Sequence, residues 1–259
     1  VELLERAAYY GFFIAITLYL TRVVGYDDIW AGWISGVFGA GLYFLPAFTG
    51  AYADKIGFRK AVILAFSLLA VGYFTLGFLP DKLIVIPALF LVMVGGSFIK
   101  AIITGTVAKC SNEETRAKAF SIFYLVVNIG AFLGKTFAYP MRLQMGVQSI
   151  NYYSAAMSAI AIVVAFFFFR GLKGEGEGKT IKEVWDGFIR VISNVRLLML
   201  VLIVTGFWMI QQQLYATMPK YVLRMVGEGA APEWLANVNP AVVMISVYFI
   251  THVMSKVRA

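Results

Sequence analysis

The chain of 259 residues is 61% hydrophobic and only 14% charged, which excludes the composition of an ordinary soluble domain. Its formal net charge of +8 does not indicate a nucleic-acid partner, because the cations gather in alternate loops between long apolar segments. A single cysteine, Cys110, excludes an internal disulfide framework and offers no metal-ligand spacing. The composition therefore predicts a polytopic α-helical membrane protein.

Eight segments are long and apolar enough to cross about 30 Å of hydrocarbon as helices. In chain order they are residues 2–24, 29–53, 61–80, 83–108, 119–141, 151–169, 197–223 and 235–253. Small residues on the second segment permit close approach of another helix: Gly32, Gly36 and Gly39. Prolines predict kinks at three places: Pro46, Pro87 and Pro140. The chain lacks an initial Met and stops just after a span, so we expect it to belong to a longer protein.

The long connection between the sixth and seventh segments has two parts. Residues 171–178 alternate Gly with charge and predict a flexible stretch. Thr180 and Glu183 then predict a capping box, at the start of an amphipathic helix on the inner membrane surface. Its apolar face consists of Ile181, Val184, Trp185, Phe188, Val191 and Ile192. We therefore expect a six-helix bundle at 1–169, a linker with this interfacial helix at 170–196, and the first two helices of a second bundle at 197–259.

The loops after the second, fourth and sixth segments, and the end of the chain, carry most of the Lys and Arg residues. The positive-inside rule places these loops, the 170–196 linker and the N-terminus in the cytoplasm of a cell-membrane protein.

Five charged side chains fall inside the predicted spans, where a charge costs at least about 2.5–3.5 kcal/mol unless it finds a partner. They are Glu2, Glu5, Arg6, Lys100 and Lys135. Glu2 and Arg6 are four residues apart, so they lie on one side of a helix. Lys100, Asn128 and Tyr43 should lie about 12–15 Å from the inner ends of their helices. Polar groups from four helices are thus predicted to meet near the middle of the membrane, although Lys135 has the alternative of reaching the outer headgroups.

Such a group is suited to coupling a solute to a proton. A buried carboxylate beside Arg or Lys stays ionised, and losing that partner favours protonation. A solute that takes over Arg6 or Lys100 would therefore change the proton occupancy of Glu2 or Glu5, and linkage makes the effect reciprocal. The alternative is that the ion pairs only hold the helices together.

The first-helix charges belong to a recognisable pattern, ELLERAAYYG at residues 2–11. Further motifs are GAYADKIGFRK at 50–60, GGSFIKAII at 95–103, FYLVVNIGAF at 123–132, FWMIQQQ at 207–213 and NVNP at 237–240. The first resembles the ExxER–YYG signature of proton-dependent oligopeptide transporters, which belong to the major facilitator superfamily. The second resembles that superfamily's loop between helices two and three, and the others are similar to helices four, five, seven and eight.

The resemblance implies an all-α major-facilitator bundle with about eight of the usual twelve transmembrane helices. It implies a proton-coupling and salt-bridge network of Glu2, Glu5, Arg6 and Lys100. It implies that the substrate is bound by Tyr9, Tyr10, Tyr43, Asn128, Trp208, Gln212 and Asn239, although the tyrosines could equally serve packing. It also implies a cytoplasmic gate loop with Gly50, Asp54, Arg59 and Lys60, whose basic residues could instead only fix topology.

Three residues depart from the family pattern. Phe13 stands where the family commonly carries an Arg that helps hold the peptide carboxylate, and Ala101 replaces a Pro. Gln212 stands where the seventh helix carries a Glu tied to proton movement, and Gln does not titrate near neutral pH. Either coupling runs through Glu2 and Glu5 alone, or the substrate is not an ordinary di- or tripeptide.

We expect a symporter that imports di- or tripeptides, or related small zwitterions, with protons by alternating access. The proton is the coupling ion, no cofactor is expected, and the partners are the peptide-like solute, protons and membrane lipid. We expect a monomer that binds no nucleic acid. The sequence has no phosphate loop and no nucleophile–base pair, so we expect no enzyme. Two rivals stay open: a porter for a drug, nitrate or amino-acid derivative, and a non-transporting membrane sensor or scaffold.

Overall fold

The computed structural model describes residues 1–113, 115–169 and 181–257, and these residues form eleven helices. In chain order they are α1 (Glu2–Arg22), α2 (Asp28–Phe44), α3 (Pro46–Ile56), α4 (Phe58–Phe78), α5 (Lys82–Lys109), α6 (Arg116–Met145), α7 (Ser149–Phe168), α8 (Ile181–Ser193), α9 (Val195–Ala216), α10 (Met218–Val226) and α11 (Pro232–Val257). Among the described residues, six helices are long and apolar enough to cross a membrane, or seven if the bent pair of α2 and α3 counts as one span. The predicted all-helical membrane bundle is confirmed. The eighth predicted span, 235–253, falls in α11, which runs into residues whose side chains lie outside the described part.

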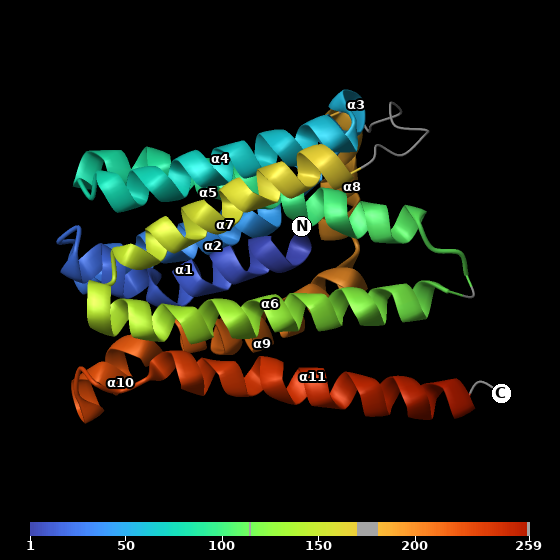
Figure 1. The fold of residues 1–259 in the computed structure, drawn as a ribbon. Helices are drawn as coiled ribbons and strands as arrows, with labels where there is room; N and C mark the ends of the chain where they lie inside the picture. The colour runs from blue at the N-terminus through green and yellow to red at the C-terminus, as the bar shows by residue number, and fades with distance from the viewer. Residues whose placement is uncertain (114, 170–180, 258–259) are drawn as a thin grey trace.

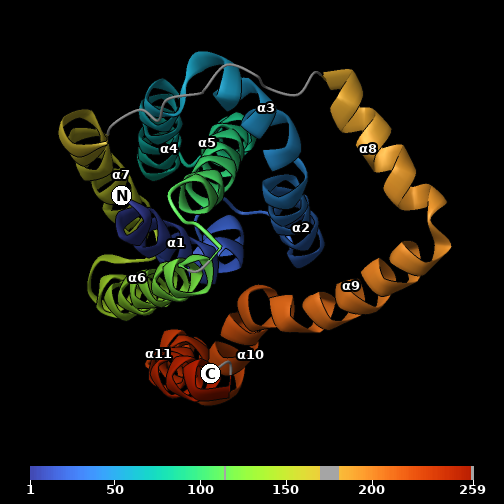
Figure 2. The same cartoon turned by 90° about the vertical axis from the view of Figure 1, so that its right-hand side faces the viewer.

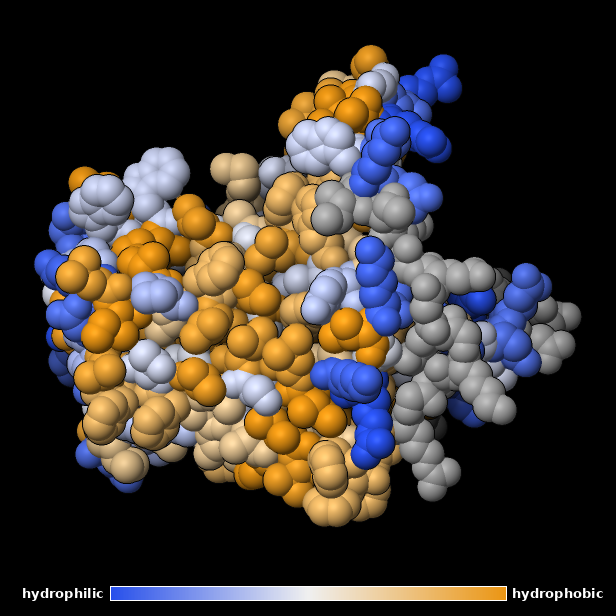
Figure 3. All heavy atoms as spheres, turned by 90° about the horizontal axis from the view of Figure 1, so that it is seen from above, coloured by the Kyte–Doolittle hydropathy of each residue, from blue (hydrophilic) through white to orange (hydrophobic). Residues whose placement is uncertain are grey.

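The long helices run side by side (Figure 1), and charged residues gather at their ends. On the face drawn in Figure 3, apolar atoms cover the middle of the molecule, and hydrophilic atoms gather at its two ends. This distribution suits a bundle whose centre lies in hydrocarbon. Helix α1 ends at Arg22 on the left of Figure 1, and we call this side of the molecule the Arg22 end. Helix α4 begins on the opposite side, which we call the Lys60 end.

Polar side chains cap three helices by accepting hydrogen bonds from the first free backbone N–H groups. Asp27 accepts from the N–H of Trp30 at 2.7 Å, Asp81 from Leu83 at 2.9 Å, and Asn194 from Leu197 at 3.2 Å. The predicted cap at Thr180 lies outside the described residues. The amphipathic helix that follows it in the sequence is present as α8, with Phe188 packed 5.4 Å from Phe44 of α2 between ring centroids.

Two predicted spans are broken rather than continuous. The segment 29–53 divides at Leu45 into α2 and α3, bent by 47°, because Pro46 begins a new helix. The segment 197–223 was predicted as one span, which is wrong: it divides at Thr217 into α9 and α10, with Pro219 in the first turn of α10. Helices α5 and α6 continue through Pro87 and Pro140.

Helix α1 lies inside the bundle, where α2, α6, α7, α9 and α10 pack around it (Figure 2). Its closest approach is to α6, because Gly130 and Gly134 present no side chain there. A Cβ on Gly134 would lie 2.2 Å from the carbonyl oxygen of Ala7, and one on Gly130 would lie 2.7 Å from that of Leu3. No helix of the described residues uses the close approach that Gly32, Gly36 and Gly39 permit, since a Cβ at any of them would meet nothing within 4 Å.

Candidate functional site

Two carboxylates on α1 share one guanidinium. Arg6 Nε donates to Glu2 Oε1 at 2.7 Å and lies 2.9 Å from Glu5 Oε2. The Nε atom carries a single hydrogen, which points to Glu2, so Oε2 of Glu5 accepts no hydrogen bond. All three side chains are buried, and Oε2 of Glu2 is also without a hydrogen-bond partner. Three members of the predicted four-residue network, Glu2, Glu5 and Arg6, therefore form a desolvated triad with unfilled acceptor sites.

Lys100 reaches this region from α5 without pairing with the glutamates. Its Nζ lies 3.5 Å from the ring centroid of Tyr43 and 5.9 Å from that of Tyr9. Both distances are within the range of cation–π attraction. Among the ion pairs of the described residues, none joins Lys100 to Glu2 or Glu5. Aromatic faces hold the cation here, and its three donors are left for another partner.

A smaller cavity of about 200 Å³ brings together six of the seven predicted substrate-binding residues. Tyr9 and Tyr10 line it from α1, Tyr43 from α2, Trp208 and Gln212 from α9, and Asn239 from α11. Arg6 stands one helical turn before Tyr10, so the buried charges continue directly from the cavity wall along α1.

The seventh predicted residue, Asn128, lines neither cavity described here. Its amide nitrogen donates 2.7 Å to the backbone carbonyl of Tyr124, one turn earlier in α6. The prediction of Asn128 in the pocket is therefore not supported by the geometry. Its depth was estimated correctly as mid-helix, but depth alone does not tell which way a side chain faces.

Three cavity residues were not singled out from the sequence as binding residues: Phe207, Gln211 and Tyr215. All lie on α9, and Gln211 and Tyr215 are four residues apart, on the same face. The FWMIQQQ motif could have indicated this face. Phe13, noted as a departure, stacks on Tyr9 at 5.2 Å and tilts against Tyr215 at 5.3 Å between ring centroids.

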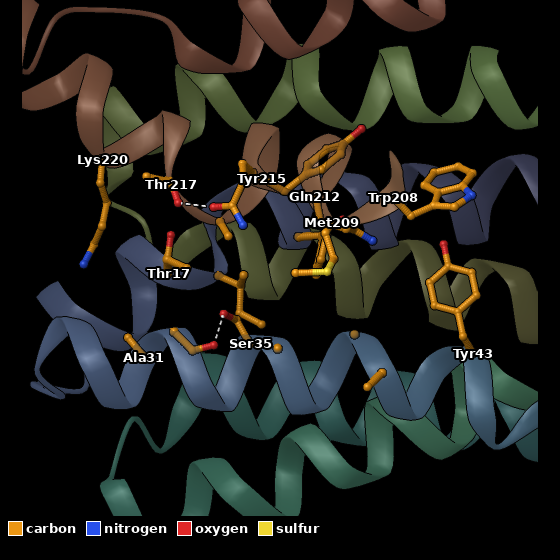
Figure 4. Close-up of a pocket in the computed structure, with 18 of the residues that line it drawn as sticks. Thr17, Ala31, Ser35, Tyr43, Trp208, Met209, Gln212, Tyr215, Thr217 and Lys220 are labelled. Carbon is orange, nitrogen blue, oxygen red and sulfur yellow. Dashed lines mark hydrogen bonds between the residues drawn. The ribbon is translucent and has the colours of Figure 1, made fainter. Parts of the chain in front are cut away.

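A larger cavity of about 1000 Å³ adjoins the smaller one and lies mainly between α2 and α9. Figure 4 shows Lys220 at one extremity and Tyr43 facing Trp208 at the other. The two spaces share an aromatic and amide wall, because both cavities are lined by Phe13, Tyr43, Trp208, Gln212 and Tyr215. Most other lining groups are small or apolar, which suits an apolar ligand group.

The predicted gate loop joins several helices at the Lys60 end. Arg59 donates 2.7 Å from Nη2 to the carbonyl oxygen of Phe166 in α7, and its guanidinium lies 5.6 Å from that ring. Asp54 lies 3.8 Å from Nζ of Lys109 at the end of α5. Lys60 is exposed, and a Cβ on Gly50 would lie 3.2 Å from Ala101. Residues 50–60 therefore form the end of α3, Gly57 and the start of α4, and they contact α5 and α7; their role as a gate stays a prediction.

A buried ion pair was missed by the sequence analysis. Every Asp and Glu other than Glu2 and Glu5 was assigned to loops, but Glu233 lies in the first turn of α11 and is only 2% exposed. It accepts from Arg142 Nε at 2.6 Å and from Nη2 at 3.2 Å. The same guanidinium donates to the carbonyl oxygens of Ala230 at 2.6 Å and Glu228 at 3.2 Å. Both charges sit near span ends, where sequence position does not separate a loop from a buried contact.

The profile of the family described as Major Facilitator Superfamily matches residues 2–259, nearly the whole chain. The chain belongs to the major facilitator superfamily. The six or seven apolar helices of membrane-spanning length among the described residues agree with a multi-span membrane protein of this family.

Two curated relatives of this chain carry the name "Multidrug resistance protein MdtH". The chain is 26% identical over 246 residues to that of Salmonella arizonae and 24% identical over 241 residues to that of Photorhabdus laumondii. Each match covers 92% of this chain and 59% of the relative, so the chain spans about three fifths of their length.

Solved structures similar to this chain include peptide transporters. One, a bacterial homologue of the human drug peptide transporters PepT1 and PepT2, has a TM-score of 0.79 at 19% identity, over 98% of this chain and 69% of that one. Another, a POT family transporter in complex with 5-aminolevulinic acid, has a TM-score of 0.61 at 24% identity, over 80% and 45%. At these identities the likeness establishes the shared fold.

Proposed function

We propose that the whole protein is a proton-coupled symporter for small peptide-like solutes that carry a carboxylate. The observation that carries the proposal is the buried triad of Glu2, Glu5 and Arg6 beside the smaller cavity. With both carboxylates ionised, the triad has a formal charge of −1, which is expensive in a desolvated site. One proton neutralises it, and each glutamate has an oxygen free to take that proton.

The solute end of the coupling is supplied by two cations that keep unused donors, Lys100 and Arg6. Lys100 is held by the rings of Tyr9 and Tyr43, and within the described chain no hydrogen bond from Nη1 or Nη2 of Arg6 is present. A solute carboxylate that pairs with either cation removes positive charge from the vicinity of the glutamates. Proton and solute then favour each other's binding, which is the thermodynamic basis of symport.

Gln212, Gln211 and Asn239 add neutral donors and acceptors around the same cavity, and the tyrosine and tryptophan rings provide apolar surface. Peptide groups need amide partners of this type, while side chains of varied size need apolar walls. The resemblance of ELLERAAYYG to the peptide-transporter signature and the peptide-transporter fold of the solved relatives support this assignment.

The test is uptake of labelled dialanine by proteoliposomes that contain the whole protein, with the interior made alkaline. We expect accumulation that depends on the pH gradient, loss of that accumulation in Glu5→Gln, and retention of counterflow exchange by the same variant. A matched control is Glu228→Gln, the same change at an exposed loop carboxylate. Uptake by Glu5→Gln that still follows the gradient would overturn the proposed coupling.

A second candidate, export of apolar drugs, is favoured by the curated relatives and by the larger cavity. The two candidates differ in the charge that the solute must carry. Proton-driven export of a lipophilic cation, combined with failure of millimolar dialanine to compete, would reject peptide transport and support this alternative.

A further inference from the structure

Lys135 is a buried cation that the proposed coupling does not use. It lies in the middle of α6, its side chain is completely buried, and no carboxylate of the described residues lies within ion-pair distance of it. Its Nζ instead donates 2.8 Å to the backbone carbonyl oxygen of Ala236 in α11. The sequence alternative of reaching the headgroups is therefore wrong, because Lys135 points to another helix.

The carbonyl that Lys135 contacts lacks the usual i+4 donor of its own helix. In an α-helix the carbonyl of Ala236 would accept from the N–H of the residue four positions later, which is Pro240. Proline has no N–H, so the oxygen would remain an unfilled acceptor in a buried place. Lys135 supplies the missing donor. It thereby joins α6 to α11 at the place where Pro240 removes one backbone hydrogen bond of α11.

Polar contacts continue along the same interface. Nδ2 of Asn237 donates to the carbonyl oxygen of Phe132 at 3.2 Å and to Oγ1 of Thr136 at 3.0 Å, and the Arg142–Glu233 pair closes the Arg22 end. We call these contacts the α6–α11 seam, and Figures 1 and 2 show the two helices side by side. A transporter that works by alternating access has to change the contacts between its two bundles, and α6 and α11 are expected to belong to different bundles.

Lys135 also touches the wall of the smaller cavity. Its Nζ lies 5.4 Å from the ring centroid of Tyr10 on α1 and 5.5 Å from that of Tyr215 on α9. Both rings line the cavity, and they lie 6.0 Å apart between centroids. One side chain thus connects the cavity wall to the seam through two aromatic faces and one hydrogen bond.

We propose that Lys135 couples occupancy of the smaller cavity to closure of the α6–α11 seam. It is a positioning residue that acts through Tyr10 and Tyr215: a solute that holds the two rings in place keeps the cation on Ala236 and the Arg22 end closed. This part rests on the proposed function, since it takes a peptide-like solute as the occupant.

The experiment follows seam opening with a single cysteine in the whole protein, reconstituted in liposomes. Ala138 is completely buried one turn after Lys135 and packs with Ala236, so Ala138→Cys, with Cys110 and any cysteine outside residues 1–259 changed to Ser, reports water entering the seam. The rate of labelling by a water-soluble maleimide is measured with and without dialanine. We expect dialanine to slow labelling at least threefold.

The decisive variant is Lys135→Met combined with Pro240→Ala. Alanine at 240 returns the backbone N–H to Ala236, so the helix is satisfied and only the link to the rings is lost. We expect its Tm to stay within about 3 °C of that of Pro240→Ala alone, a shift of at most about 1–2 kcal/mol, while the response to dialanine disappears. Lys118→Met, the same change at an exposed lysine of α6, should keep the full response.

A threefold response that persists in Lys135→Met/Pro240→Ala overturns the inference. If dialanine has no effect on any protein, including the unsubstituted one, the proposed peptide function has failed, and the basal rate decides about Lys135. If the basal labelling rate of Lys135→Met/Pro240→Ala is at least threefold that of Pro240→Ala, Lys135 has a role in the seam. Equal basal rates in the two variants refute that role.

Discussion

The buried pair of Arg142 and Glu233 allows a prediction whose size follows from the structure. Glu233→Gln removes the negative charge but keeps the shape of the side chain. Arg142 then remains as a cation with a side chain only 4% exposed, and its acceptors are two backbone carbonyls and one uncharged amide oxygen, with no negative charge among them. The first turn of α11 loses its ion pair with α6, while the loop carbonyls of Glu228 and Ala230 keep their bonds to Arg142.

The expected loss is large because one charge is left behind. Breaking a buried ion pair by removing one partner costs about 3–5 kcal/mol. For a domain of 150–250 residues, this corresponds to a fall in Tm of about 6–20 °C. The double variant Arg142→Met/Glu233→Leu leaves no charge unpaired, so its loss should be well below the sum of the two single losses.

Thermal unfolding of the purified protein in detergent measures these values. Glu228→Gln is the matched control, since Glu228 is paired with Arg22 at side-chain exposures of 68% and 42%, where a pair contributes at most about 1 kcal/mol. If Glu233→Gln lowers the Tm no more than Glu228→Gln does, Arg142 and Glu233 are not a buried, stabilising pair.

Three other predictions concern the α1–α6 contact, a loop carboxylate and the cavity cation. Gly134→Ala should destabilise the protein by about 1–3 kcal/mol in thermal unfolding, because its Cβ meets backbone of α1, whereas Gly32→Ala should be neutral. Hydrogen bonds from Arg22 hold the pKa of Glu228 below its ordinary value, so the Tm advantage over Glu228→Gln should be present at pH 7 and lost as the pH falls through that lowered pKa. Lys100→Met should reduce dialanine uptake at least tenfold, while Lys100→Arg, which keeps a cation over the Tyr43 ring, should retain most of it.

Much of the cavity could be predicted because the family pattern fixes both helix and face. ELLERAAYYG sets the order of charges and tyrosines along α1, and helical periodicity then places Arg6 and Tyr10 on one side. The membrane adds a strong constraint, since charges inside spans have to face the protein interior. These two constraints account for the positions of Glu5, Tyr9 and Lys100.

The rest could not be predicted because it depends on contacts between distant segments. Whether Gly134 or Gly32 meets another helix is decided by which helix lies opposite, and the sequence of one helix does not tell this. The partner of Lys135 is a backbone carbonyl freed by Pro240, about a hundred positions later in the chain. The side-chain pattern does not predict which backbone carbonyl accepts this bond, so the bond can be identified only from the folded structure.

The buried carboxylates also indicate where a coupling proton can bind. Among the described residues the buried acidic side chains are Glu2, Glu5 and Glu233. Both oxygens of Glu233 accept from Arg142, so protonation there would break existing bonds, whereas Glu2 and Glu5 each have an oxygen without a hydrogen-bond partner. Gln212 does not titrate near neutral pH. Under the proposed symport, coupling within this part of the chain falls to the α1 pair. Glu5→Gln should then abolish gradient-driven uptake in a stable protein, while Glu233→Gln should lower stability and leave the coupling of the folded fraction intact.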